Sequence, residues 1–127
     1  MGGAIKMKTL TLLALILLTT ASHALERDYQ IPWCNAQNGE PHRLPNGTQV
    51  DCLTKTHAVE VDDAKKFYEA IGQSLFYAMH TGKRAGILLI VNLPSDQRYL
   101  NRLNNTIAHH GLPIDVFTVK KEQTHAK

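Results

Sequence analysis

The chain has 127 residues, which is enough for one domain. Its formal net charge is +3, but residues 1–24 hold two of the 14 Lys and Arg residues and none of the 11 Asp and Glu residues, so residues 25–127 carry a net charge of only +1. A net charge this small gives, by itself, no reason to expect a polyanionic partner. The two cysteines form no CxxC pattern, which excludes the common redox and zinc motifs.

The first 24 residues have the pattern of a secretion signal. Lys6 and Lys8 precede the apolar run TLTLLALILLTT, and the tripeptide SHA at 22–24 has small residues where signal peptidase reads them. The run is short for a transmembrane helix. We therefore expect a cleaved signal peptide at 1–24 and a periplasmic or secreted protein with no membrane segment after cleavage. An uncleaved N-terminal anchor is the alternative.

Residues 25–41 contain several helix breakers, and we expect them to be irregular. The breakers are Pro32, Asn38-Gly39 and Pro41. Cys34 lies within this segment and Cys52 lies beyond it. In an oxidising compartment such a pair is typical of a disulfide, which contributes roughly 3 kcal/mol by the loop-entropy argument. Two buried free thiols are the alternative.

The rest of the chain alternates strand and helix patterns. Pro45-Asn46-Gly47-Thr48 predicts a tight turn, because Asn-Gly readily supplies positive φ. The run AGILLIV is continuously apolar, as expected for a strand that is covered on both faces. We expect strands at 43–44, 49–53, 57–61, 85–91 and 114–119, helices from about 63 to 79 and from 97 to 109, and a polar tail at 120–127.

This order, β-β-β-α-β-α-β, predicts an α/β domain at 42–119 with a mixed sheet. The first strands are joined by short turns and therefore pair antiparallel, whereas the later ones are separated by helices and therefore run parallel.

A second turn is predicted at Lys55-Thr56, where it joins the strands 49–53 and 57–61 into a hairpin, and three carboxylates gather around it. Asp51 lies on one strand of the hairpin, Glu60 lies on the other, and Asp62 follows at its end. Acids repel one another, so folding alone gives no reason to bring them together. A hard cation such as Mg²⁺ gives one, because it takes one or two carboxylates together with waters and substrate phosphate.

The helix that follows carries a polar stripe that is separate from its apolar face. Lys66, Gln73 and Tyr77 are spaced i, i+7, i+11, so they lie on one side of the helix, away from the apolar face around Phe67 and Ile71. We expect this stripe to present Lys66 beside the cation and the other two side chains toward a ligand.

These residues together resemble the PD-(D/E)XK nuclease superfamily. The likeness covers about residues 43–119, and the Q-x-x-x-Y helix is similar to that of the RecB-like and phage-exonuclease-like branches. It implies a restriction-endonuclease-like three-layer sandwich in which Asp51, Glu60 and the carbonyl of Val61 bind Mg²⁺ or Mn²⁺. It also implies that Gln73 and Tyr77 position the substrate.

The chain departs from the family pattern at the lysine two residues after the Glu. Asp62 stands there, and Lys66 matches a position to which some members of the superfamily move this lysine. The acid that the family often places on a preceding helix has no clear counterpart, and we expect Glu40 as its substitute and Asp62 as an accessory acid.

The sequence therefore predicts an exported metal-dependent nuclease with Asp51, Glu60 and Lys66 as catalytic residues and DNA as the substrate. A homodimer would enlarge a small surface for base contacts. A catalytically inactive domain of the same fold, binding nucleic acid or a protein partner in the cell envelope, is the alternative. Each of these residues also has an ordinary interpretation as a solvated strand or helix residue, so the prediction depends on their joint placement.

Overall fold

The computed structural model describes residues 25–122; the predicted signal peptide and the last residues of the tail lie outside them. Five strands form one sheet in the order β1-β2-β3-β4-β5. The strands are β1 (Glu40–Arg43), β2 (Gln49–Leu53), β3 (His57–Asp63), β4 (Arg84–Val91) and β5 (Ile114–Lys120). The first three pair antiparallel, and β3, β4 and β5 pair parallel. The predicted α/β class with a mixed sheet is confirmed.

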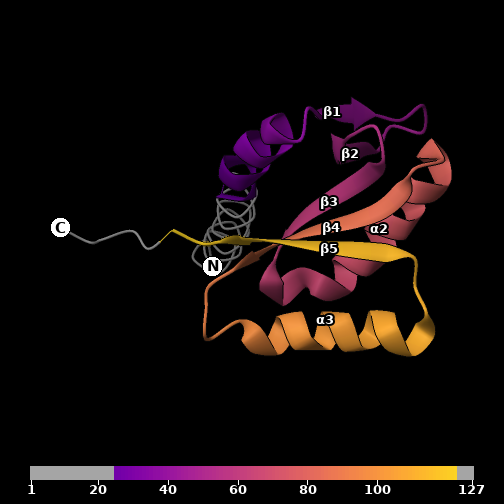
Figure 1. Cartoon of the computed structure of the whole chain (residues 1–127). Helices are drawn as coiled ribbons and strands as arrows, with labels where there is room; N and C mark the ends of the chain where they lie inside the picture. Colours follow the sequence, from indigo (N-terminus) through magenta and orange to yellow (C-terminus); the bar gives the residue numbers. More distant parts are fainter. Residues whose placement is uncertain (1–24, 123–127) are drawn as a thin grey trace, which may run out of the picture.

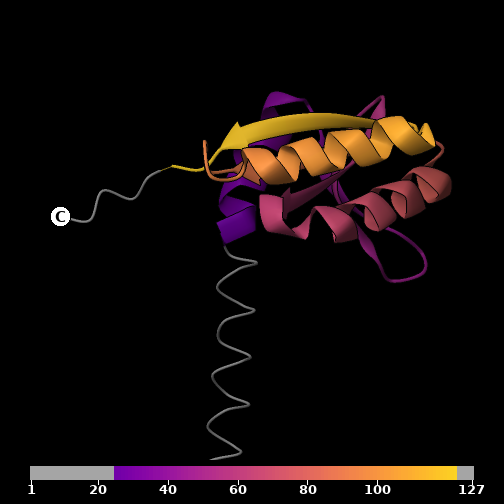
Figure 2. The same ribbon diagram turned by 90° about the horizontal axis from the view of Figure 1, so that it is seen from below.

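Helices cover the sheet on both faces (Figures 1 and 2). The 3-10 turn η1 (Ala64–Lys66) leads into α2 (Phe67–Thr81), and α3 (Gln97–His110) follows β4. These two helices lie side by side on one face, while the helical segment 25–36 lies on the other. Within residues 25–122, no helix has both the length and the apolar character needed to cross a bilayer.

The larger core lies between the sheet and the α2–α3 pair. Phe67 and Ala70 of α2 and Leu103 of α3 are buried against Ile87 and Leu89 of β4. On the opposite face, β4 presents alternate residues to a smaller core beneath segment 25–36. The central strand β4 is therefore buried on both faces, which explains its continuous apolar sequence.

The expectation of an irregular segment at 25–41 is wrong. Residues 25–36 are helical, and β1 begins at Glu40. Pro32 indicated a break, but tertiary packing outweighs it: Tyr29 and Trp33 pack on the sheet, and Cys34 is 2 % exposed. Lys120, which we expected to begin the polar tail, is instead the last residue of β5.

The predicted disulfide is present. Cys34 and Cys52 are bonded, with their Cα atoms 5.7 Å apart. The bond attaches segment 25–36 to β2 at the residue next to Asp51. This bond therefore fixes the helical segment beside the predicted site.

Replacing both cysteines by serine should lower the free energy of unfolding by about 3 kcal/mol, because the unfolded chain regains the entropy of the opened loop. Urea unfolding of the double variant and of the parent measures this. An unchanged free energy of unfolding would contradict a structural role for the bond. The same titration under reducing conditions should bring the parent down to the level of the variant.

Candidate functional site

Asp51 of β2 comes together with Glu60 and Asp62 of β3, which lie on the α2 side of the sheet. Cys52 pairs with Val59, so the next residues along the two strands, Asp51 and Glu60, come opposite each other. Val59 and Val61 face segment 25–36, whereas Ala58 packs against α2; strand alternation therefore directs Glu60 and Asp62 toward α2. The gathering of these acids, predicted from the hairpin, is present in the structure.

Asp51 links the two strands through its side chain. Its Oδ2 accepts a hydrogen bond from the backbone N–H of Val61 at 2.9 Å. Its carboxyl group also shares a hydrogen bond with that of Glu60. Two carboxyl groups can make such a bond only while a proton lies between them, and a bound cation can take the place of that proton.

Burial raises the pKa values of Glu60 and Asp62 above neutral pH. Glu60 is 7 % exposed, and burial, followed by the charges of Asp51 and Asp62, raises its pKa to about 10. Asp62 is 4 % exposed, and burial together with the charge of Glu26 raises its pKa to about 8, although Lys66 acts in the opposite direction. The site thus holds protons that a cation can displace.

One oxygen of Asp62 has no hydrogen-bond partner. Among the buried side-chain nitrogen and oxygen atoms of residues 25–122, Oδ2 of Asp62 is the one left unsatisfied. A buried polar atom without a partner costs roughly 1–3 kcal/mol. An unsatisfied carboxyl oxygen among other acids is an arrangement that a cation or its water shell can complete once the proton is displaced.

The helical segment 25–36 contributes two further residues that the sequence did not predict. Glu26 Oε1 accepts a hydrogen bond from Lys66 Nζ at 2.9 Å, and Gln30 Nε2 donates to the backbone oxygen of Asp51 at 2.7 Å. The i, i+4 spacing of Glu26 and Gln30 was the available signal. It was obscured by the adjacent signal peptide and by Pro32.

Glu40 does not take the place that we expected. It lies exposed on β1, and Glu26 is instead the additional acid whose charge acts on Glu60 and Asp62. The additional acid beside the cluster thus comes from the helical segment 25–36.

Lys66 lies at the junction of η1 and α2, beside the acids. Its partial burial lowers the pKa of the ammonium group, but the hydrogen bond and ion pair with Glu26, with smaller contributions from Asp62 and Glu69, raise that pKa overall. Lys66 is therefore a firmly charged cation at the edge of a buried acidic group.

Of the two predicted ligand-positioning residues on α2, only Tyr77 lies toward the acids. Tyr77 is 8 % exposed, and burial, with the charges of Glu60, Asp51 and Asp62, raises the pKa of its hydroxyl group. Gln73 is exposed, one turn earlier on the same helix.

Solvent reaches Asp51, at the edge of the cluster, beside segment 25–36. A hollow of about 270 Å³ opens there, with Glu26, Gln30 and Asp51 in its wall and Arg27 at its side. A ligand that approached through this hollow would meet an acid-rich wall together with one guanidinium group.

The chemistry of these side chains suits a hard cation, although the ligand set is small. Within residues 25–122, no three His, Cys, Asp or Glu side chains are arranged to hold a metal ion together. Mg²⁺, however, often takes only one or two protein carboxylates and completes its shell with water and phosphate. The hydrogen-bonded Asp51–Glu60 pair and the unsatisfied oxygen of Asp62 fit that requirement.

No protein-family model matches the chain, and comparisons with curated proteins and with solved structures also give no match.

Replacing Asp62 by Asn should raise the free energy of unfolding by about 1–3 kcal/mol at pH 8. Between the ordinary pKa of 3.8 and the folded value of about 8, the folded state holds a proton that the unfolded state has lost. Stability of the parent therefore falls as pH rises through this window, and the variant avoids that part of the loss. Near pH 4 the two proteins should differ much less.

Urea unfolding at pH 4 and pH 8 measures this difference, with Asp28→Asn as the matched control, since Asp28 is an exposed acid of segment 25–36. The control should change stability by no more than about 0.5 kcal/mol at either pH. Equal effects of Asp62→Asn at the two pH values would contradict the assignment of a buried, protonated Asp62.

Proposed function

We propose that the chain is an exported metal-dependent nuclease that hydrolyses phosphodiester bonds, with DNA as the substrate class that the resemblance favours. The observation that carries this proposal is the buried group of acids on β2 and β3, which includes the hydrogen-bonded Asp51–Glu60 pair and the unsatisfied oxygen of Asp62. The disulfide is consistent with export.

We also propose that the fold is of the restriction-endonuclease-like type. Three features support this. The sheet has the order β1-β2-β3-β4-β5, β2 runs antiparallel to its neighbours, and helices cover both faces. The helical segment 25–36 supplies an acid, Glu26, where the family often has one.

In this proposal Asp51, Glu60 and the carbonyl group of Val61 hold Mg²⁺ or Mn²⁺. Such a cation lowers the pKa of a bound water and offsets charge on the phosphodiester. Lys66 offers its ammonium group to the negative charge that develops on the phosphate, and Glu26 holds it there. Arg27, in the wall of the hollow, attracts the backbone of the nucleic acid.

Tyr77 and Gln73 have different places in the mechanism. Tyr77 is buried beside the acids, where its hydroxyl group can orient a phosphate or a water molecule. Gln73 is exposed, which suits contact with a strand that passes over α2. Neither residue transfers a proton in the proposed reaction.

The cleavage test uses plasmid and single-stranded DNA with Mg²⁺, Mn²⁺ or EDTA. Cleavage should require the metal, and Asp51→Asn or Glu60→Gln should lower its rate by at least about a hundredfold, because each removes a charged ligand. Metal-dependent cleavage that survives both changes would overturn the proposal, since the acids are its foundation.

Lys66→Ala should also lower the cleavage rate, by about tenfold to a thousandfold, because the charge opposite the phosphate is lost. Lys65→Ala is the matched control: Lys65 is the preceding residue, has the same charge and is exposed. Equal rates for the two variants would show that Lys66 has no special position.

One observation favours the second candidate, a catalytically inactive domain that binds nucleic acid or a protein partner. The acid Asp62 stands where the family has its lysine, and it faces Glu60 from the same strand. In that case the protein would bind DNA without cleaving it, and Asp62→Lys, which restores the family residue, should introduce cleavage.

A further inference from the structure

A second polar group lies at the other end of the parallel strands. Glu60 and Asp62 lie in the middle and toward the end of β3, with Asp51 beside them on β2. In contrast, His57, Arg84 and Asp115 lie at or next to the first residues of β3, β4 and β5. The strand register brings these starts together, since His57 pairs with Arg84 and Gly86 pairs with Asp115. This group is therefore a separate site and not an extension of the acidic cluster.

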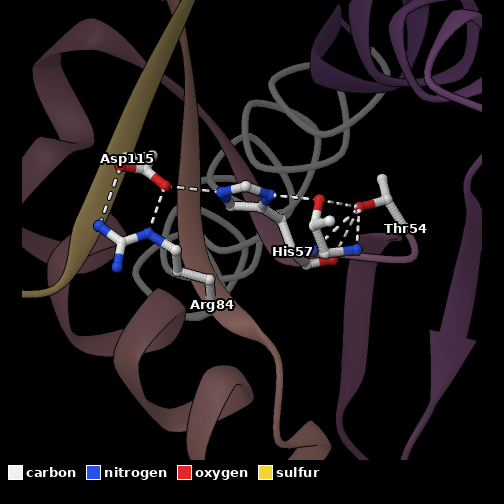
Figure 3. Close-up of polar contacts among 5 residues, drawn as sticks. Thr54, His57, Arg84 and Asp115 are labelled. Carbon is white, nitrogen blue, oxygen red and sulfur yellow. Dashed lines mark hydrogen bonds and ion pairs between the residues drawn. The ribbon is translucent and has the colours of Figure 1, made fainter.

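Asp115 fixes the orientation of the His57 ring (Figure 3). Its Oδ2 lies 2.7 Å from Nε2 of His57 and 2.6 Å from Nε of Arg84, and its Oδ1 lies 3.1 Å from Nη2 of Arg84. These hydrogen bonds, first from Arg84 and then from His57, lower the pKa of Asp115 to about 2. Asp115 is thus an ionised group that can only accept hydrogen bonds, and Nε2 of His57 must carry the proton that it accepts.

The orientation of the ring determines the role of the next hydroxyl group. Nδ1 of His57 lies 2.7 Å from Oγ1 of Thr56. When the ring carries one proton, that proton is on Nε2, so Nδ1 accepts and the Thr56 hydroxyl group donates to it. The oxygen of Thr56, which also lies 3.5 Å from Oγ1 of Thr54, keeps acceptor capacity for a ligand with an N–H group.

This polar chain borders a pocket with aromatic walls. The pocket has a volume of about 320 Å³, within the range of small-molecule sites, and its walls include Trp33 and Phe117. The two rings lie 5.3 Å apart between centroids, and the His57 ring meets Phe117 edge-on at 5.5 Å. At Gly86 a side-chain Cβ would lie 3.3 Å from the Phe117 ring, so glycine leaves room for this packing.

The rim of the pocket supplies amide groups and positive charge. Gln37 and Asn38 present exposed amides, which can both donate and accept. Lys55 also lines the pocket, and Nζ of Lys83 donates to the backbone oxygen of Lys55 at 2.8 Å, so two ammonium groups belong to this turn. Aromatic walls, amide groups and a cationic rim together match a planar base that bears a phosphate.

We propose that this pocket binds a nucleoside monophosphate, with the base against Trp33 and Phe117, an exocyclic amino group donating to Thr56, and the phosphate toward Lys55. Stacking on aromatic side chains is worth roughly 1–3 kcal/mol per base. The acceptor at Thr56 favours cytosine over uracil, because cytosine has an amino group where uracil has a carbonyl oxygen. The proposal does not depend on the nuclease function, since none of its residues belongs to the acidic cluster.

The test uses the fluorescence of Trp33, which is the only tryptophan of the chain and lies in the pocket wall. The purified protein is titrated with CMP, UMP, AMP, GMP and cytidine. CMP should give a saturable change with a dissociation constant below about 1 mM. It should bind more tightly than UMP or cytidine.

Two variants localise the binding. Thr56→Val keeps the shape but removes the acceptor, and should weaken CMP binding about fivefold to tenfold while leaving UMP nearly unchanged. Lys55→Gln should weaken CMP binding but not cytidine binding. Asp51→Asn, in the acidic cluster, should leave both titrations unaltered, so that failure of the nuclease proposal and failure of this one are distinguished.

Three results would overturn the proposal. The first is the lack of a saturable change with every nucleotide up to about 10 mM. The second is saturation with neutral monosaccharides while the nucleotides have no effect, which would indicate a carbohydrate site. The third is CMP binding that neither Thr56→Val nor Lys55→Gln weakens, which would place the nucleotide elsewhere.

Discussion

The burial of carboxyl groups on β3 is the constraint on which the rest of the site depends. Glu60 and Asp62 face α2 with little exposure, and Asp51 reaches the same place from β2. Such a group is tolerated only if its charge is reduced, by protons or by a cation. The surrounding elements meet part of this requirement: Val61 donates its N–H to Asp51, and Lys66 lies beside Asp62. These contacts leave Oδ2 of Asp62 without a hydrogen-bond partner.

Attachment of segment 25–36 to the sheet makes this arrangement possible. The disulfide, the packing of Trp33 and the bond from Gln30 to Asp51 hold the helical segment beside β2, and Glu26 from that segment then pairs with Lys66. Glu122, two residues after β5, reinforces the attachment, since its N–H donates to the hydroxyl group of Tyr29. Stability and site geometry are therefore coupled through one short helix, although the two sites lie at opposite ends of β3.

Much of the fold and part of the site could be predicted from the sequence. Local patterns were sufficient to predict the buried strand β4 and the helix α2, which follow from the periodicity of apolar residues. The convergence of Asp51 with Glu60 followed from the turn between their strands, and the disulfide followed from the expected oxidising compartment. The helix at 25–36 could not be predicted in this way, since its stability comes from contacts with distant residues such as Phe117 and Cys52. The contacts of Glu26 and of the His57–Asp115–Arg84 group were missed for the same reason. Both join residues that are far apart in the sequence and meet only in the folded chain.

Calorimetric titration of the protein with Mn²⁺ would show whether the buried acids hold a cation, because it measures cation binding and proton release without assuming any reaction. At pH 7, in buffers that differ in ionisation enthalpy, we expect binding with release of at least one proton, since burial raises the pKa of Asp62 to about 8 and that of Glu60 to about 10. The double change Asp51→Asn with Glu60→Gln should abolish the binding. Absence of binding by the folded protein, or binding without proton release that the double change leaves intact, would contradict a cation site at these acids.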